Sequence, residues 1–178
     1  MRLEKLQKNS PDIISVKKLN EQAFPENERV SIDGLFDFDS DGSMDILGIY
    51  EDIFEGFFVI RKCVDIAYIA YFAICPEIRS KGKGSHALQK LKEYYKGRQI
   101  VVDFEAPDKN SQNNNERIRR RSFYSKNGFY ETGWFQYYME MEFEIFCSSI
   151  PFNKKRFDEM NADIHSKYPA YDPHPYKK

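Results

Sequence analysis

A basic, glycine-containing turn is the part of this sequence whose residue types point most directly to chemistry. Residues 76–85 read Pro-Glu-Ile-Arg-Ser-Lys-Gly-Lys-Gly-Ser, between an apolar run at 66–74 and a segment of helical periodicity at 84–96. Gly82 and Gly84 permit positive φ and the close approach of a ligand to the backbone. The first amides of a helix lack intrahelical partners, and the helix dipole adds positive potential there. The turn therefore predicts an anion site suited to a pyrophosphate.

Two other ligand chemistries fail on spacing. A Walker A loop needs G-x-x-x-x-G-K-[ST], but Gly84 is followed by Ser85 where the lysine should stand. A calcium loop starting at Asp37 has Gly42 correctly at its sixth position, but Gly48 stands at the twelfth, where a glutamate is required. Neither a P-loop nor an EF-hand is therefore expected.

A dinucleotide-binding fingerprint fits the turn more closely. Gly82-x-Gly84-x-x-Ala87 matches its relaxed form, and Asp103 follows about 20 residues later. However, the polar run 77–81 separates the expected strand from the first glycine, and no second strand-helix-strand half follows. This interpretation is the weaker one.

Counted as R-x-x-G-x-G, residues 79–84 resemble the turn of the GNAT superfamily of acyl-CoA-dependent N-acetyltransferases. The resemblance extends in order from residue 2 to about 146, through Phe24-Pro25 ahead of Glu28-Arg29, Leu47-Gly48-Ile49-Tyr50, Gly56-Phe57, Ala73-Ile74-Cys75-Pro76 and Phe123-Tyr124-Ser125-Lys126-Asn127-Gly128-Phe129. It implies an α/β GNAT fold, a mixed and mostly antiparallel sheet flanked by helices. The central strands 66–74 and 100–104 would splay apart to admit the thioester of acetyl-CoA, and no metal is implied.

The resemblance also implies which residues contact the cofactor. The family's pattern places an asparagine seven residues before the tyrosine, whereas position 117 is arginine and the nearest asparagine is Asn115. The implied pantetheine contacts are the backbones of Ala73, Ile74 and Cys75, and the implied pyrophosphate contacts are Arg79, Ser80, Lys81, Gly82, Lys83, Gly84 and Ser85, with Asn115 as the candidate on the later helix.

Acetyl transfer to an amine needs a base and an acid. Deprotonating an amine of pKa near 10.4 at pH 7 costs about 4.6 kcal/mol, so a carboxylate or an ordered water is expected as base. Glu105 is the first candidate, because it shares a strand face with Asp103 near the end of 100–105, and Glu28 is the second. By resemblance, Tyr124 would protonate the departing thiolate.

Two sets of side chains bear on how that transfer would proceed. On a helical wheel Tyr124 shares a face with Arg117, Arg120 and Arg121, which would place it near an anionic ligand. Cys75 ends a buried strand with no predicted neighbouring histidine, so direct attack in a ternary complex is expected rather than an acyl-enzyme.

Composition narrows the class of protein. The chain has 178 residues, with 27 Lys+Arg against 28 Asp+Glu, which predicts one domain without bulk attraction to nucleic acid. Residues 26–55 hold ten acidic side chains and one arginine, while 79–98 hold seven basic side chains and one glutamate. This split suits either CoA phosphates and a cationic amine or two solvated faces. The arginines at 117–121 leave contact with RNA as a weaker alternative.

The cysteines and the apolar runs indicate a cytoplasmic protein. Cys63, Cys75 and Cys147 form no C-x-x-C pair, so neither a disulfide framework nor a zinc site is expected. The longest apolar run, 66–75, is half of what a membrane span needs. No membrane partner is therefore expected.

Periodicity places these residues on elements. We expect strands at 2–6, 46–50, 54–61, 66–74, 100–104 and two within 129–146, helices from Ser10-Pro11 to Phe24 and at 28–36, 84–96, 113–125 and 153–167, an acidic loop at 37–43, and a loosely held tail from Tyr168. The run 66–74 should be buried on both faces.

The sequence thus predicts a GNAT domain at 1–150 with a C-terminal helical extension and tail at 151–178. Its expected activity is N-acetyl transfer from acetyl-CoA to a primary amine of a small-molecule or peptide acceptor. The alternative is a non-catalytic acyl-CoA-binding sensor or accessory subunit. Homodimerisation is left open.

Overall fold

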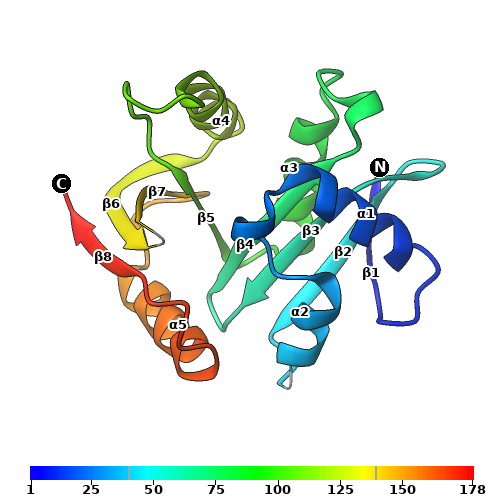
Figure 1. Cartoon of the computed structure of the whole chain (residues 1–178), viewed down its shortest axis with the longest axis horizontal. Coiled ribbons are helices and arrows are strands. Elements are labelled where there is room, and N and C mark those ends of the chain that lie inside the picture. Colours follow the sequence, from blue (N-terminus) through cyan, green and yellow to red (C-terminus); the bar gives the residue numbers. More distant parts are fainter. Residues whose placement is uncertain (40, 139) are drawn as a thin grey trace. The chain divides into compact units, whose positions relative to one another are not determined.

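The computed structural model describes residues 1–39, 41–138 and 140–178 (Figure 1). The chain forms two compact units, one of residues 1–62 and 68–96 and the other of residues 63–67 and 97–178. No helix in the described part of the chain is both long and apolar enough to span a membrane.

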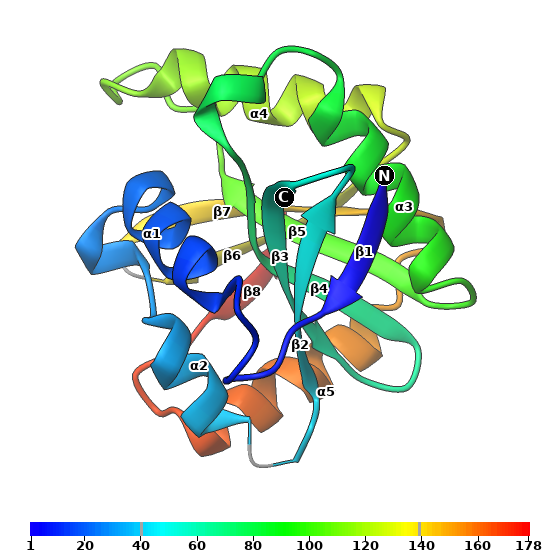
Figure 2. The same cartoon turned by 90° about the vertical axis from the view of Figure 1, so that its right-hand side faces the viewer.

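The first unit contains four strands in the order β1-β2-β3-β4, with β1 antiparallel to β2 and β2 antiparallel to β3. Figure 2 shows α1 and α2 on one face of these strands and α3 on the other. Buried side chains of α1, such as Val16 and Leu19, join Leu35 and Phe57 in one core. The elements are β1 (Arg2–Lys5), α1 (Ile13–Ala23), α2 (Ile32–Phe38), β2 (Met44–Tyr50), β3 (Phe54–Lys62), β4 (Ile66–Ile74) and α3 (Lys83–Tyr94).

The first two helices begin later than the sequence predicted. Ser10 accepts a hydrogen bond from the Gln7 amide, so it closes a turn before α1 rather than capping the helix. α2 begins after Ser31, whose hydroxyl accepts the Gly34 amide, and a short 3₁₀ helix occupies Glu26–Glu28. Side-chain capping therefore fixes the start of α2, whereas α1 begins after Asp12 without a side-chain cap.

The acidic loop uses its carboxylates to hold its own backbone. Asp39 accepts a hydrogen bond from the Met44 amide at 2.8 Å, and Asp41 accepts one from the Ser43 amide at 3.0 Å. Residue 40 lies outside the described residues. Within the ranges that are described, no group of three or more His, Cys, Asp or Glu side chains could hold a metal ion.

The second unit is an antiparallel sheet in the order β5-β7-β6-β8, and α4 and α5 cover opposite faces of it (Figure 1). The predicted loose tail was wrong in part, because β8 pairs with β6 from Trp134↔Lys177 to Tyr137↔His174. Pro175 is tolerated because β8 is an edge strand. The elements are β5 (Gln99–Glu105), α4 (Asn114–Lys126), β6 (Tyr130–Tyr138), β7 (Met141–Cys147), α5 (Lys154–Lys167) and β8 (His174–Lys177).

The strand β4 differs from its prediction in burial. Its first half is buried, but Ala70 is exposed and Tyr71 and Phe72 are only half-buried. Tyr71 packs edge-on against Phe24, and Phe72 stacks on Phe58. An apolar run does not distinguish a covered strand from one that is open along part of its length. The predicted separation of 66–74 from 100–104 stays a prediction, because these strands belong largely to different units.

Candidate functional site

The turn between β4 and α3 is exposed and has the backbone geometry that its glycines predicted. Gly82 has φ +74 and Ser80 has φ +63, and α3 begins at Lys83. A Cβ added at Gly82 would meet no atom within 4 Å, so this side of the turn is open. The Arg79 Nε donates to the Ile74 carbonyl at 2.9 Å and ties the turn to the end of β4.

The amides of this turn are available to a ligand. The first amide that bonds back into the helix is that of His86, which donates to the Gly82 carbonyl at 3.1 Å. Among the residues that the structure describes, none accepts a hydrogen bond from the amides of residues 80–85. A row of amides at a helix N-terminus is suited to an anion.

Lys83 does not contribute a free cation to the turn. Its ammonium forms ion pairs with Glu51 and, at 2.6 Å, with Glu55. Hydrogen bonds to these two carboxylates raise the pKa of Lys83 and keep it charged. The exposed basic side chains of the turn are therefore those of Arg79 and Lys81.

The end of β4 lies unusually close to β3. The Cys75 amide donates to the Glu55 carbonyl at 2.8 Å, so by alternation the backbone of Ile74 faces away from β3. A Cβ at Gly56 would lie 2.3 Å from the Ala73 carbonyl oxygen, so only glycine fits there. Burial raises the pKa of the Cys75 thiol, which opposes formation of a nucleophilic thiolate.

Tyr124 is buried in the second unit. Its ring stacks on Phe104 at 5.3 Å between centroids and meets Phe123 and Phe129 edge-on. Burial raises the pKa of its phenol, so the side chain stays protonated at neutral pH. Asn115, by contrast, is exposed in the first turn of α4.

Glu105 is held by three side chains from the start of α4 and the loop before it. Arg117 lies 2.7 Å from one carboxylate oxygen and Arg120 lies 3.2 Å from the other. Asn113 donates at 3.3 Å, and only 8% of the Glu105 side chain is exposed. The carboxylate therefore anchors α4 to the end of β5.

The arginines that share a helix face with Tyr124 have carboxylate partners. Arg117 and Arg120 bind Glu105, and Arg121 binds Glu144 at 2.9 Å. The helical wheel could not show these contacts. They neutralise the arginine charges, so an anionic ligand is not needed to explain why the arginines lie there. Glu28, the second candidate base, is exposed on the 3₁₀ helix of the first unit.

Sequence reasoning missed a buried amide that binds Asp103 and a second buried amide that binds the first. Gln136, on β6, donates to the Asp103 carboxylate at 2.5 Å, and Asn161, on α5, donates to Gln136 at 3.2 Å. The available signal was a single glutamine, Gln136, among the aromatic residues of β6. Side-chain alternation along this strand turns Gln136 inward.

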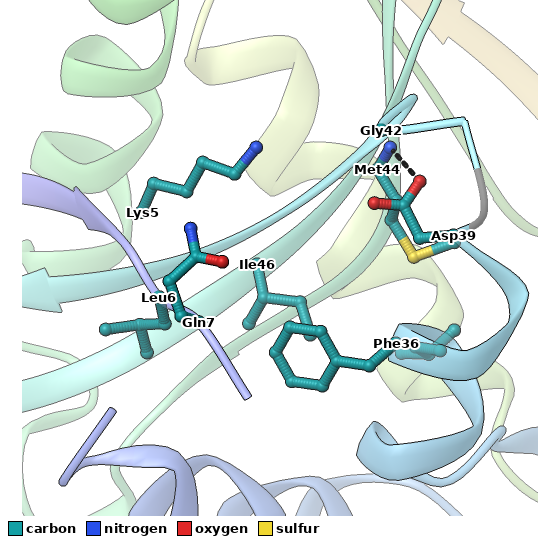
Figure 3. Close-up of a pocket in the computed structure, with 9 residues that line it drawn as sticks. Lys5, Leu6, Gln7, Phe36, Asp39, Gly42, Met44 and Ile46 are labelled. Carbon is teal, nitrogen blue, oxygen red and sulfur yellow. Dashed lines mark hydrogen bonds between the residues drawn. The ribbon is translucent and has the colours of Figure 1, made fainter. Parts of the chain in front are cut away.

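A cavity of about 210 Å³ in the first unit lies away from the turn (Figure 3). It opens where β2 begins, beside the end of β3, whereas the turn lies near the start of β3 at Gly56. Asp39 at its rim already binds the Met44 amide, and Lys5 binds Asp45 at 2.6 Å. The lining residues are Lys5, Leu6, Gln7, Leu35, Phe36, Asp39, Gly42, Met44 and Ile46.

Comparison with solved structures agrees with this fold. A structure described as a GNAT-family acetyltransferase from Bacteroides thetaiotaomicron matches with TM-score 0.76 and 22% identity over 93% of this chain and 97% of that one. An aminoglycoside 6'-N-acetyltransferase complexed with coenzyme A matches with TM-score 0.65 and 13% identity, over 85% and 99%. The ribosomal-protein-S18-alanine N-acetyltransferase of Escherichia coli matches with TM-score 0.60 and 15% identity, over 85% and 96%.

At the level of sequence, a search of curated proteins found no match. The sequence model of the acetyltransferase (GNAT) family, however, matches residues 14–129, which is more than half of the chain and includes the turn, Glu105 and Tyr124. The chain therefore belongs to the acetyltransferase (GNAT) family.

Proposed function

We propose that this chain transfers the acetyl group of acetyl-CoA to a primary amine by direct attack. The observation that carries the proposal is the open row of amides at residues 80–85, at the N-terminus of α3. Family membership and the coenzyme A complex of a structural relative support it.

The residues of the turn fit a diphosphate. The amides of Ser80 to Ser85 would hold its oxygens, and Arg79 and Lys81 would add positive charge. Of Ala73, Ile74 and Cys75, the residues expected to hold the pantetheine arm, Ile74 would make the backbone contact, because it faces away from β3 while the Cys75 amide donates to Glu55. Asn115 remains a candidate contact from α4.

Bound acetyl-CoA supplies an activated thioester. The acceptor amine must lose one proton, and the departing sulfur must gain one, as a C–N bond forms and the C–S bond breaks. Tyr124, protonated at neutral pH, would donate the second proton. The raised pKa of the Cys75 thiol supports direct attack over an acyl-enzyme.

Of the two predicted bases, Glu28 stays a candidate. We assign Glu105 an anchoring role instead, because Asn113, Arg117 and Arg120 all bind its carboxylate. The acceptor would be a small-molecule or peptide amine, the two classes that the aminoglycoside and S18-alanine enzymes represent. Free thiols at all three cysteines support a cytoplasmic setting.

Binding of the diphosphate by the turn is tested with two glycine variants that both strain the backbone. Gly82 and Gly97 both have positive φ and open space at the Cβ position, so valine strains the backbone at either site. Only Gly82→Val would reorient the amides of the turn. We expect it to weaken acetyl-CoA binding at least tenfold in calorimetry, whereas Gly97→Val should change the Kd less than twofold.

Turnover is followed by release of free CoA thiol with a panel of primary amines. Acetyl-CoA at 100 times its Kd should stabilise the wild type by about 2.7 kcal/mol, which raises the Tm by roughly 5–10 °C. No stabilisation by acetyl-CoA, or equal loss of affinity in both glycine variants, would contradict binding of the diphosphate by the amides of residues 80–85. No turnover with any amine would contradict the transferase.

A further inference from the structure

The lysine of the turn between β4 and α3 has its ammonium bound on the hairpin formed by β2 and β3. Lys83 forms ion pairs with Glu51, in the turn of that hairpin, and with Glu55, near the start of β3, at 2.6 Å. Both carboxylates come from the acidic stretch 26–55, and Lys83 comes from the basic stretch 79–98. Part of the charge split in the sequence is therefore resolved inside the first unit, by contact between the two stretches.

This cluster is partly shielded from water. The Lys83 side chain is 20% exposed and the Glu55 side chain 7% exposed, whereas Glu51 lies nearer the surface. Solvent and salt screen a shielded ion pair much less than an exposed one. Hydrogen bonds to the two carboxylates raise the pKa of Lys83, and the hydrogen bond from Lys83 lowers the pKa of Glu51. The ammonium and its partners therefore stay charged and in contact at neutral pH.

The cluster lies against the turn that we propose as the diphosphate site. The Glu55 carbonyl accepts the Cys75 amide at 2.8 Å just before the turn, and the Glu55 carboxylate binds Lys83 at the start of α3. Glu55 thus contacts the chain on both sides of residues 76–82. A charge carried by this cluster acts directly on an anion held by the amides of residues 80–85.

The charges of the cluster oppose the binding of an anion. Two carboxylates against one ammonium leave one net negative charge beside the turn. They also occupy an ammonium of the kind that binds phosphate oxygens through charge-assisted hydrogen bonds. The site therefore has a lysine in its sequence whose charge is not available to the ligand.

Stability alone does not explain the buried carboxylate. The Oε2 atom of Glu55 is buried without a hydrogen-bond partner in the part of the chain that the structure describes. A buried polar atom without a partner lowers stability. Departures of this kind from the most stable choice are typical of functional sites.

We propose that Glu51 and Glu55 set the affinity of the turn for the diphosphate of coenzyme A by withholding Lys83 from the anion. This inference rests on the proposed function and adds two affinity-determining residues to it. Acetyl-CoA and the product CoA carry the same diphosphate, so tighter binding at the turn would lower KM without raising kcat and would slow the release of CoA. The two carboxylates therefore favour turnover over tight binding.

The decisive variant is Glu51→Gln/Glu55→Gln, titrated with acetyl-CoA in a calorimeter at low ionic strength. Each single change leaves Lys83 one carboxylate, so we expect the Kd to fall by about two- to threefold. In the double variant the ammonium can bind the anion, and the Kd should fall at least about twentyfold, more than the product of the single effects. Release of CoA, followed by stopped flow, should slow by a similar factor.

Two further variants show whether Lys83 carries the gain. Adding Lys83→Met to the double variant should return the Kd to within about threefold of the wild type, because only the net charge change remains. Asp52→Asn removes the same charge from an exposed position in the same hairpin turn and should change the Kd less than about 1.5-fold. Glu51 is only half-buried, so Glu51→Gln beside Asp52→Asn keeps the test open if the Glu55 variant does not fold.

The outcomes separate this inference from the function it rests on. No binding of acetyl-CoA by the wild type or the double variant would overturn the proposed function, and this inference with it. A wild type that binds acetyl-CoA, with a double variant that gains no more than the product of the single effects, would overturn the withholding of Lys83 alone. Normal binding and the expected gain, without turnover of any amine, would overturn the transferase and support the role of the two carboxylates.

Discussion

Replacing Glu105 with glutamine should lower the stability of the second unit, because the Glu105 carboxylate anchors α4 there. We expect this structural effect rather than a direct effect on acetyl transfer. The carboxylate of Glu105 is 8% exposed and lies 2.7 Å from Arg117, whose side chain is 11% exposed. Glutamine keeps the shape and one acceptor oxygen but removes the charge. Arg117 is then left buried without its counter-charge, whereas Arg120, 43% exposed, can turn to water.

The magnitude follows from that asymmetry. Breaking a buried pair costs about 3–5 kcal/mol, and the retained hydrogen bond offsets about 1 kcal/mol. We therefore expect the free energy of unfolding to fall by about 2–4 kcal/mol and the Tm by roughly 5–15 °C. Urea unfolding followed by fluorescence of Trp134, the single tryptophan, reads this loss in the unit that contains Glu105.

The control is Glu116→Gln, an exposed change in the first turn of the same helix, which should cost less than about 1 kcal/mol. The midpoint must move at constant m for the comparison to hold. If Glu105→Gln kept the wild-type midpoint and lost turnover a hundredfold with acetyl-CoA affinity intact, the anchoring role would be wrong. Glu105 would then be the base after all.

Three further predictions concern stability. Gly56→Ala should cost about 3 kcal/mol or more in thermal unfolding, because the new Cβ meets the Ala73 carbonyl at 2.3 Å, whereas Gly42→Ala, with open space, should cost about 1 kcal/mol. Burial opposes ionisation of Asp45, but hydrogen bonds from Lys5, Lys62 and Tyr95 outweigh it and lower its pKa. The stabilisation by Asp45 is therefore present above about pH 4 and lost below it. Asp45→Asn should lower the free energy of unfolding by about 2–3 kcal/mol at pH 7, and this free energy, measured with urea, should then fall less steeply as the pH is lowered below about 4. Burial raises the pKa of Tyr124, so wild-type stability should fall as pH rises above about 10, where the phenol ionises in the unfolded chain. Tyr124→Phe should reduce the slope of stability against pH in this range by up to about 1.4 kcal/mol per pH unit. An unchanged slope would contradict the burial of the phenol.

Local signals predicted the turn and its two flanking elements well. The glycines at 82 and 84, the apolar run before them and the periodic segment after them each act within a few residues, so the geometry at Gly82 could be expected. The family resemblance placed Tyr124, and the structure adds that its environment is aromatic and dry. These features depend on neighbours in the sequence or on a motif that contains them.

The partners of charged side chains could not be predicted in the same way. Glu105 and Arg117 lie twelve positions apart across a polar loop, and no local pattern says that they meet. Asp103 reaches its partners from β6 and α5 only because three separate segments fold onto one sheet face. The apolar run 66–74 also gave no signal that Ala70 is exposed while Ile69 is buried.

The pairing of β8 with β6 has a consequence for how copies of this protein behave toward one another. Four residues, 174–177, occupy the hydrogen-bonding groups along half of the nine-residue strand β6. Deleting them would leave a bare row of donors and acceptors, the kind of edge along which foreign strands dock and aggregates start. With them in place, the outermost strand is short and carries Pro175, which offers no amide proton to a neighbour. The short strand β8 thus leaves fewer unpaired backbone groups at the sheet edge for another copy of the chain to bind.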